Sequence, residues 1–256
     1  MQSSVTFEQP LNERVRTFLR VEFLFDQVEH YITGASEWDN RHTITTMLEV
    51  TEFLSRSDLR SELIKELERH AATLNSLNGT PGVDNERLQY ILDEINGYLS
   101  TLRNSEYQPG QALRQDEFIN SVKQRVTIPG GTCNFDLPGY YHWLQQSATE
   151  RIQHLETWRS DLTTISKSIK LCLQMIRNST NPSNQIAEKG FFQKPIESNT
   201  ACQLIRVMLP PDSHYYPEIS GGRHRFTIRF MEQPATTARA IQTADDVQFE
   251  LHCCIL

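Results

Sequence analysis

Residues 221–230 carry the residue types that most directly suggest binding chemistry, in the order GGRHRFTIRF. In a β-strand, successive side chains point to opposite faces of the sheet. One face of this stretch would carry apolar side chains from Phe226, Ile228 and Phe230, with His224. The other would carry a row of three arginines, Arg223, Arg225 and Arg229. Because a guanidinium can hold a carboxylate through two parallel hydrogen bonds, this row suits a carboxylate-bearing partner.

The alternative for the arginine row is an ordinary solvated strand face. Charged rows are common on the open face of antiparallel sheets, where they pair with acids on a neighbouring strand. Residues 247–253 also alternate, and we expect this last strand to pair with the arginine strand. Its polar face carries Glu250, which could neutralise one arginine but not all three.

Composition limits the classes of protein and partner. The chain has 256 residues, of which 25 are Lys or Arg and 32 are Asp or Glu, and its net charge is −7. This acidity argues against nucleic acid as the main partner. No apolar run approaches the roughly 20 residues that cross a bilayer. The first 15 residues lack the apolar core of a signal peptide. We therefore expect a cytoplasmic protein without membrane insertion.

The cysteines do not suggest a disulfide framework or a zinc site. There are five, none in a C-x-x-C pair, which fits a reducing compartment. The last four residues, CCIL, match a prenylation box. The alternation of residues 247–253 explains the same cysteines as part of a final strand, which is the expectation we retain.

No catalytic constellation is present in the sequence. It contains no G-x-S-x-G, no H-E-x-x-H and no phosphate-binding loop. His30 and His154 lack partners at ligand spacing, so we expect no metal, no cofactor and no catalytic residue. One enzymatic alternative stays open, in which Cys133 serves as a thiol nucleophile in a pocket between two domains. The other interpretation of Cys133 is a small buried side chain.

Helical periodicity dominates the first 180 residues. Asn12 can cap a helix that runs to about residue 31, and Asp84 can cap another. Asp136 is placed to cap a helix whose first turn contains Pro138. A capping box at Ser147 opens the longest predicted helix, whose apolar residues form a heptad seam over residues 155–176. This seam could pack inside a bundle or against a second copy of the chain.

The pattern changes from helix to strand near residue 178. A polar, Pro-containing linker at residues 178–184 precedes strand patterns at 191–192, 201–209, 221–230 and 247–253. We therefore predict an α+β protein, with an N-terminal α-helical bundle followed by a smaller antiparallel β domain. The predicted domains are residues 1–180, of which 1–8 are a candidate strand for the β domain, and residues 181–256.

Several short stretches, in order along the whole chain, resemble the bacterial cell-division protein ZapD family. They include PLNE at 10–13, PGVD at 81–84, IPGG at 128–131, FDLP at 135–138 and IRF at 228–230. The resemblance implies a non-enzymatic cytoplasmic protein that binds the C-terminal tail of the tubulin-like division protein FtsZ. As a homodimer it would cross-link and bundle FtsZ filaments at the mid-cell division ring.

The resemblance also implies which residues bind the tail. Arg225 and Arg229 match strand positions tied to tail recognition, and three helical positions match basic residues of the same proposed surface, namely Arg16, Arg20 and Arg56. Arg223 matches no family position. The sequence departs from the family pattern at Glu117 and Tyr141, to which we assign no binding role.

Three points stay open at this stage. The apolar residues of the tail would need aromatic contacts, for which the candidates are Tyr140, Tyr215 and Tyr216. The dimer contact could involve the seam at residues 155–176 or the sheet edges. A small-ligand or anion-binding module that uses the same arginines is a further alternative.

Overall fold

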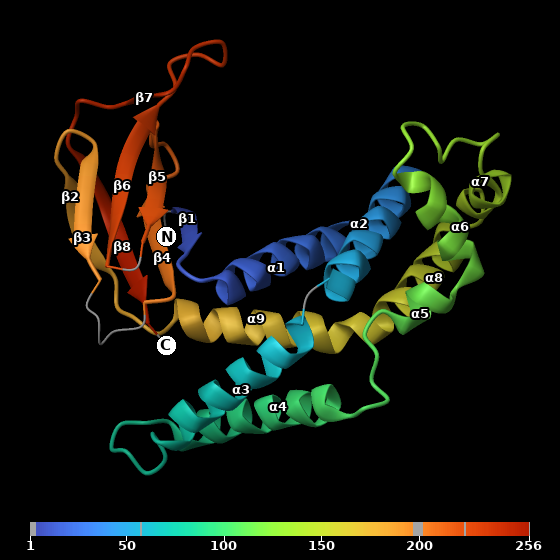
Figure 1. The fold of residues 1–256 in the computed structure, drawn as a ribbon, viewed down its shortest axis with the longest axis horizontal. Helices are drawn as coiled ribbons and strands as arrows, with labels where there is room; N and C mark the ends of the chain where they lie inside the picture. The colour runs from blue at the N-terminus through green and yellow to red at the C-terminus, as the bar shows by residue number, and fades with distance from the viewer. Residues whose placement is uncertain (1–3, 57, 197–201, 223, 256) are drawn as a thin grey trace. The chain divides into compact units, whose positions relative to one another are not determined.

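The computed structural model describes residues 4–56, 58–196, 202–222 and 224–255. The predicted α+β class is confirmed, because the helices occupy residues 13–177 and antiparallel sheets follow over residues 183–254 (Figure 1). The chain divides into two compact units, one formed by residues 18–172 and the other by Met1–Thr17 with Leu173–Leu256. The predicted domain boundary at residue 180 remains a prediction.

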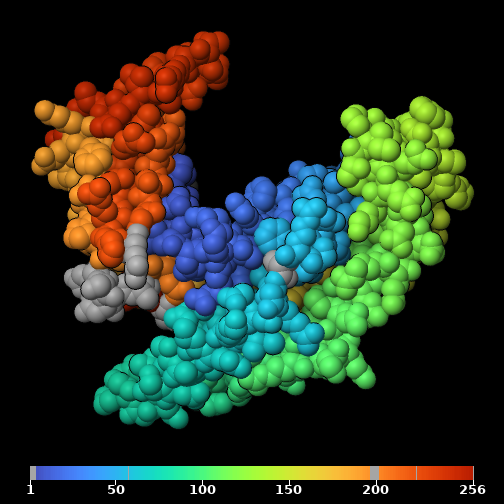
Figure 2. Space-filling view, viewed as in Figure 1, coloured from blue at the N-terminus to red at the C-terminus, as the bar shows by residue number. Residues whose placement is uncertain are grey.

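The helices form where the apolar periodicity predicts them. In chain order they are α1 (Glu13–Tyr31), α2 (Glu37–Arg56), α3 (Leu59–Asn75), α4 (Asn85–Arg103), α5 (Gln111–Gln115), α6 (Glu117–Val126), α7 (Pro138–Leu144), α8 (Ala148–Arg159), η1 (Ser160–Leu162) and α9 (Thr163–Arg177). No helix in the described part of the chain is long and apolar enough to span a membrane. Figure 2 shows the side chains of α3 and α4 packed along the length of this helix pair.

Three of the predicted caps are present. The side chain of Asn12 accepts from the backbone of Val15 (2.8 Å), and that of Asp84 accepts from the backbone of Arg87. The capping box at Ser147 is complete. These caps satisfy amide groups that the first turn of a helix leaves without partners.

The prediction that Asp136 caps α7 is wrong. Leu137 occupies the cap position without a side-chain bond, and Asp136 instead accepts from the thiol of Cys133 (3.3 Å). Pro138 does stand in the first turn, where its missing N–H costs nothing. Pro138 therefore favours the helical backbone conformation at the start of α7, whereas the carboxylate of Asp136 accepts a hydrogen bond within the loop before the helix.

The predicted long helix from residue 147 is two helices. A single 3₁₀ turn, η1, separates α8 from α9. The side chains of the heptad seam are nonetheless buried, with exposed fractions of 0% to 7% from Leu155 to Ile176. A second copy of the chain cannot reach residues buried in this way. The seam is therefore part of the core. Of the two dimer contacts that the sequence suggested, only the sheet edges remain.

The strands form two antiparallel sheets. They are β1 (Val5–Pro10), β2 (Ser183–Ala187), β3 (Phe191–Pro195), β4 (Leu204–Leu209), β5 (Tyr215–Gly221), β6 (Arg225–Glu232), β7 (Ile241–Gln242) and β8 (Val247–Cys254). The first sheet has the order β1-β4-β8-β2, and the second has the order β3-β6-β5, with β7 also paired to β6. One apolar cluster includes Val207 and Phe249 from the first sheet and Phe226 and Phe230 from the second. The two sheets therefore pack face to face as a sandwich.

A tight turn carries the chain from one sheet to the other. Lys189 and Gly190 both have positive φ (49° and 69°), as a type I′ hairpin turn requires. A Cβ on Gly190 would come 2.8 Å from the carbonyl oxygen of Thr243, so this position also needs the absence of a side chain. The turn places β2 beside β8 and β3 beside β6.

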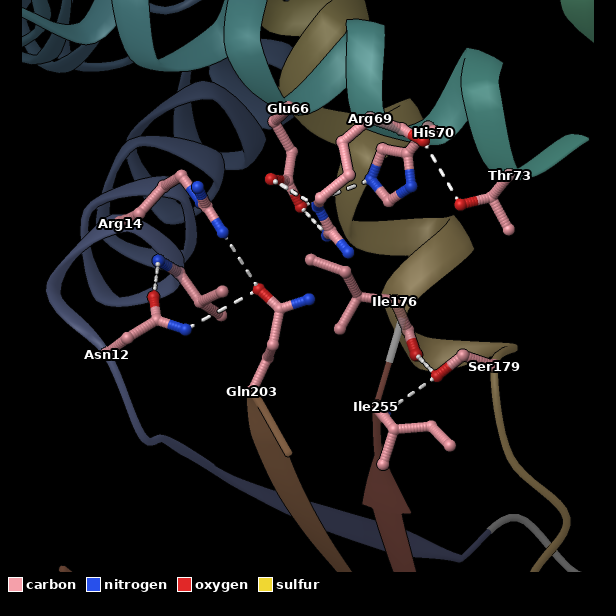
Figure 3. Close-up of polar contacts among 11 residues, drawn as sticks. Asn12, Arg14, Glu66, Arg69, His70, Thr73, Ile176, Ser179, Gln203 and Ile255 are labelled. Carbon is pink, nitrogen blue, oxygen red and sulfur yellow. Dashed lines mark hydrogen bonds and ion pairs between the residues drawn. The ribbon is translucent and has the colours of Figure 1, made fainter. Parts of the chain in front are cut away.

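The first residues of α1 are hydrogen-bonded to Gln203, the residue just before β4 of the first sheet. Its Oε1 accepts from Nη2 of Arg14 (3.2 Å) and from Nδ2 of Asn12 (3.5 Å), as Figure 3 shows. The end of β8 is held in a similar way, because the backbone of Ile255 donates to the hydroxyl of Ser179 (3.0 Å). These bonds lie within one compact unit and connect the first residues of α1 to Gln203 and the segment after α9 to the end of β8.

Candidate functional site

β6 is the central strand of the second sheet, and it shows the two faces that the sequence predicts. Phe226, Ile228 and Phe230 are 0% to 1% exposed in the sandwich core. Arg225 and Arg229 are exposed on the opposite face. They lie four residues apart, which is about 13 Å along a strand. Arg223, which the sequence places in the same row, lies outside the described residues.

Neighbouring strands complete the outer face of this sheet. Phe191 on β3 and Glu218 on β5 lie opposite Arg229. Two residues earlier on β6, the outward-facing row consists of Gln193 on β3, Thr227 on β6 and Ser220 on β5. Side chains that lie directly opposite one another in an antiparallel pair share a face. This row of three polar side chains therefore lies between Arg225 and Arg229 on the outer face.

Arg229 has an acidic partner. Its Nη2 lies 3.6 Å from Oε2 of Glu218, and the two side chains are 56% and 50% exposed. An exposed pair of this kind contributes only about 0 to 1 kcal/mol, so an external carboxylate can replace Glu218 at little cost. The acid that partners this arginine comes from β5.

The expectation that the last strand pairs with the arginine strand is wrong. β8 pairs with β4 and β2 in the other sheet. Glu250 accordingly makes its contact with His252, whose Nε2 lies 2.7 Å from Oε1 of the carboxylate. Glu250 therefore does not neutralise any arginine of β6.

Arg225 differs from Arg229 in its surroundings. It stands at the start of β6, opposite Pro195 of β3, and is exposed. It forms no ion pair with any residue in the described ranges. Its five N–H donors are thus available to a carboxylate from outside the chain. Of the two described arginines on this face, Arg225 is therefore the one whose charge is not compensated.

The two candidate arginines of α1, Arg16 and Arg20, are about one helical turn apart. Arg16 forms an ion pair with Glu13 in the first turn of the helix. Arg20 is exposed and has no ion pair among the residues that the structure describes. Their spacing puts both on one side of α1.

Arg56 ends α2 beside a groove in the helical unit. Its Nη2 lies 2.5 Å from Oε1 of Glu52, and its side chain is 76% exposed. The groove has a volume of about 760 Å³. Its lining comes from α1, α2 and α6 and the residue after α6, and consists of Leu24, Thr45, Leu48, Glu49, Glu52, Phe53, Arg56, Lys123, Val126 and Thr127. Sequence reasoning identified Arg56 but not this groove.

The three candidate tyrosines have different environments. Tyr140 is 3% exposed, and burial raises its pKa to about 12, so it cannot hold a side chain of a partner. The hydroxyl of Tyr215 donates to Asp245 (2.8 Å), which raises the pKa of the phenol, and its ring packs against the sandwich core. Tyr216 lies opposite Met231 in the row next to Arg229. It is the candidate of the three that shares the outer face with the arginines.

The residues considered for catalysis do not form a reactive cluster. The thiol of Cys133 donates to Asp136, and Nδ1 of His154 accepts from the indole of Trp143 (3.0 Å). His30 packs edge-on against Tyr31. Within the described ranges, no group of three or more His, Cys, Asp or Glu side chains is arranged to hold a metal ion.

Comparisons with known proteins agree with the sequence motifs. The family model described as "ZapD: Cell division protein" matches residues 19–229. A cell division protein ZapD of Methylococcus capsulatus is 38% identical over 256 residues, which is all of both chains. The ZapD proteins of Coxiella burnetii and of an Escherichia coli strain are 34% and 36% identical, over 98% and 99% of this chain and 98% and 100% of their own.

Proposed function

The chain belongs to the ZapD family of cell division proteins, and from this premise we propose that it binds the C-terminal tail of FtsZ. The observation that carries the proposal is the outer face of β6, where Arg225 is exposed without an acidic partner among the described residues and Arg229 has a weak one. A flexible tail with carboxylates and apolar residues fits this face.

The two arginines would act in different ways. Arg225 would take a tail carboxylate through two hydrogen bonds without releasing another acid. Arg229 would exchange Glu218 for a tail carboxylate, which changes the number of ion pairs little. Exposed apolar surface of Phe191, which is 43% exposed, and of Tyr216 would contact apolar side chains of the tail. Arg16, Arg20 and Arg56 would be further contacts for the tail on the helices.

Affinity for one tail would be modest. A disordered tail gives up conformational entropy when it binds, so a dissociation constant near the micromolar range, about −8 kcal/mol, is expected for one site. As a homodimer, the protein would hold two tails, and each FtsZ filament offers many. The second contact then benefits from a high effective concentration. The resulting cross-links would bundle filaments at the mid-cell ring in the cytoplasm, without any enzymatic step.

The proposal is tested by reversing the charge at Arg225. We expect Arg225→Glu to weaken binding of a fluorescent FtsZ tail peptide at least tenfold, measured by anisotropy, and to abolish bundle sedimentation. The control is Arg239→Glu, which makes the same change on the exposed connection after β6 that projects from the sheets in Figure 1. A folded Arg225→Glu protein that still bundles filaments would contradict the proposal.

The same assay tests the two alternatives. Cys133→Ala should leave tail binding and bundling unchanged, whereas an enzyme that uses this thiol would lose its function. A small-ligand or anion-binding module would bind small dicarboxylates or phosphate as tightly as the tail peptide, and we expect the peptide to bind more tightly.

A further inference from the structure

The groove beside Arg56 combines an apolar floor with charged groups at its rim. Leu24, Phe53 and Val126 are half-buried, and Leu48 beneath them is 6% exposed. A volume of about 760 Å³ lies in the range of sites that enclose a small ligand or a few side chains of a peptide.

Two cations converge on one carboxylate at the rim. Oε1 of Glu52 lies 2.5 Å from Nη2 of Arg56, and Oε2 lies 4.0 Å from Nζ of Lys123. Arg56 comes from the end of α2 and Lys123 from the last turn of α6, so the two positive charges approach from different helices. Glu49 also lines the groove but forms no ion pair within the described residues.

The pairing of Glu52 is easily exchanged. Its side chain is 43% exposed, and those of Arg56 and Lys123 are 76% and 49% exposed. Solvent screens pairs of this kind, and each contributes about 0 to 1 kcal/mol. A carboxylate from a partner could therefore take the position of Glu52 between the two cations. Apolar side chains next to that carboxylate would lie over the floor of the groove.

We propose that this groove binds a short segment of the tail in which apolar side chains adjoin a carboxylate, and that Glu52 is an internal competitor for that carboxylate. The proposal rests on the proposed function, because it assigns a second contact to the same partner. The geometry favours a carboxylate of the partner at the position of Glu52, because Arg56 and Lys123 both approach that carboxylate and all three side chains are exposed to solvent.

The first test removes the competitor. We expect Glu52→Gln to tighten binding of the FtsZ tail peptide about three- to fivefold, because Arg56 and Lys123 are then free for the carboxylate of the peptide. Glu49→Gln is the matched control, since it removes the same charge from the same wall of the groove. It should change the affinity less than about twofold.

The second test fills the groove without removing a charge. Thr45, whose hydroxyl donates to the carbonyl of Arg41, lines the groove, and Thr45→Phe would occupy part of its volume. We expect peptide binding about fivefold weaker or more. Thr73→Phe is the control, because Thr73 makes the same bond to the carbonyl four residues back but lies on α3, outside the groove.

The outcomes separate this inference from the proposed function. If the wild-type protein binds no tail peptide, the proposed function fails. If the wild type binds and Arg225→Glu does not, while Glu52→Gln and Thr45→Phe both bind like the wild type, the groove inference alone is overturned. A Thr45→Phe protein that sediments as a monomer when the wild type is a dimer would also overturn it, since the groove would then hold a second copy. Circular dichroism checks the fold of each variant.

Discussion

The two arginines of the candidate site are the same residue type on the same strand face, yet they differ in electrostatic environment. Arg229 shares its charge with Glu218, whereas Arg225 has no acidic partner among the described residues. We therefore expect the loss of Arg225 to weaken tail binding more than the loss of Arg229. The difference arises from the register of β5 against β6, which sets Glu218 opposite Arg229.

Glu66 is a buried carboxylate whose pKa is strongly lowered. It lies on α3 with Arg69 and His70, and Figure 3 shows the three side chains gathered on one side of the helix. Nε of Arg69 donates to the carboxylate (3.1 Å), and Nε2 of His70 lies 3.4 Å from it. Burial alone would raise the pKa of Glu66, but the contacts with His70 and Arg69 outweigh it and lower the pKa to about 2.

This lowered pKa predicts acid sensitivity. The ionised carboxylate stabilises the fold at a pH above its unfolded pKa of 4.5, and this contribution is lost as the pH falls from there towards 2. Urea unfolding measures the free energy of unfolding at pH 5 and at pH 3. We expect the decrease between these two pH values to be about 2 kcal/mol smaller for Glu66→Gln than for the wild type. Glu62→Gln is the control, because it removes a half-buried carboxylate of the same helix, and it should differ from the wild type by less than Glu66→Gln does. Identical slopes for Glu66→Gln and the wild type would contradict this account.

Among the elements, β1 pairs with β4 along its whole length, and one carboxylate adds side-chain contacts to this pairing. Glu8 accepts from Nε and Nη2 of Arg177 (2.9 and 2.8 Å) and from Nε of Arg206 (2.9 Å). These side chains are 18% to 23% exposed, so the cluster is largely shielded from water. The carboxylate therefore ties β1 both to β4 and to the end of α9.

Removing this carboxylate should destabilise the sheet unit. In Glu8→Gln, two largely buried guanidinium groups lose their counter-charge, and we expect about 2 to 4 kcal/mol less unfolding free energy in urea. Glu188→Gln serves as the control, because it removes an exposed acid of the same unit at the turn before β3. It should change the stability by less than about 0.5 kcal/mol. Equal effects of the two substitutions would show that β1 does not depend on Glu8.

At the scale of the whole molecule, the proposed bundling depends on having two tail sites in one dimer. We expect dimers that combine one wild-type and one Arg225→Glu subunit to bind a tail without cross-linking filaments. In a one-to-one mixture with random exchange, about a quarter of the dimers keep two intact sites. Bundle sedimentation should therefore fall to well below half of the wild-type level. An amount of bundling that stays at half or more would argue that one site per dimer is sufficient.

Much of the fold was predictable because its signals are local. Asn12, Asp84 and Ser147 mark helix starts through bonds within the first turn, and the alternation of residues 225–230 separates the core face of β6 from its outer face. Strands β2, β5 and β7 were not predicted. β2 has mixed polarity within the predicted linker, and β5 contains Pro217, which weakens the strand pattern.

The sequence by itself determined the helix-then-strand order, the two faces of β6 and the family motifs, because short-range periodicity and residue type suffice for each. Tertiary structure decided which acid stands beside which arginine, since strand order is set by packing over long separations in the chain. It placed Glu218 rather than Glu250 beside the arginine row and buried Tyr140. It also assembled the groove from α1, α2 and α6, because cavities arise only where distant helices pack against each other.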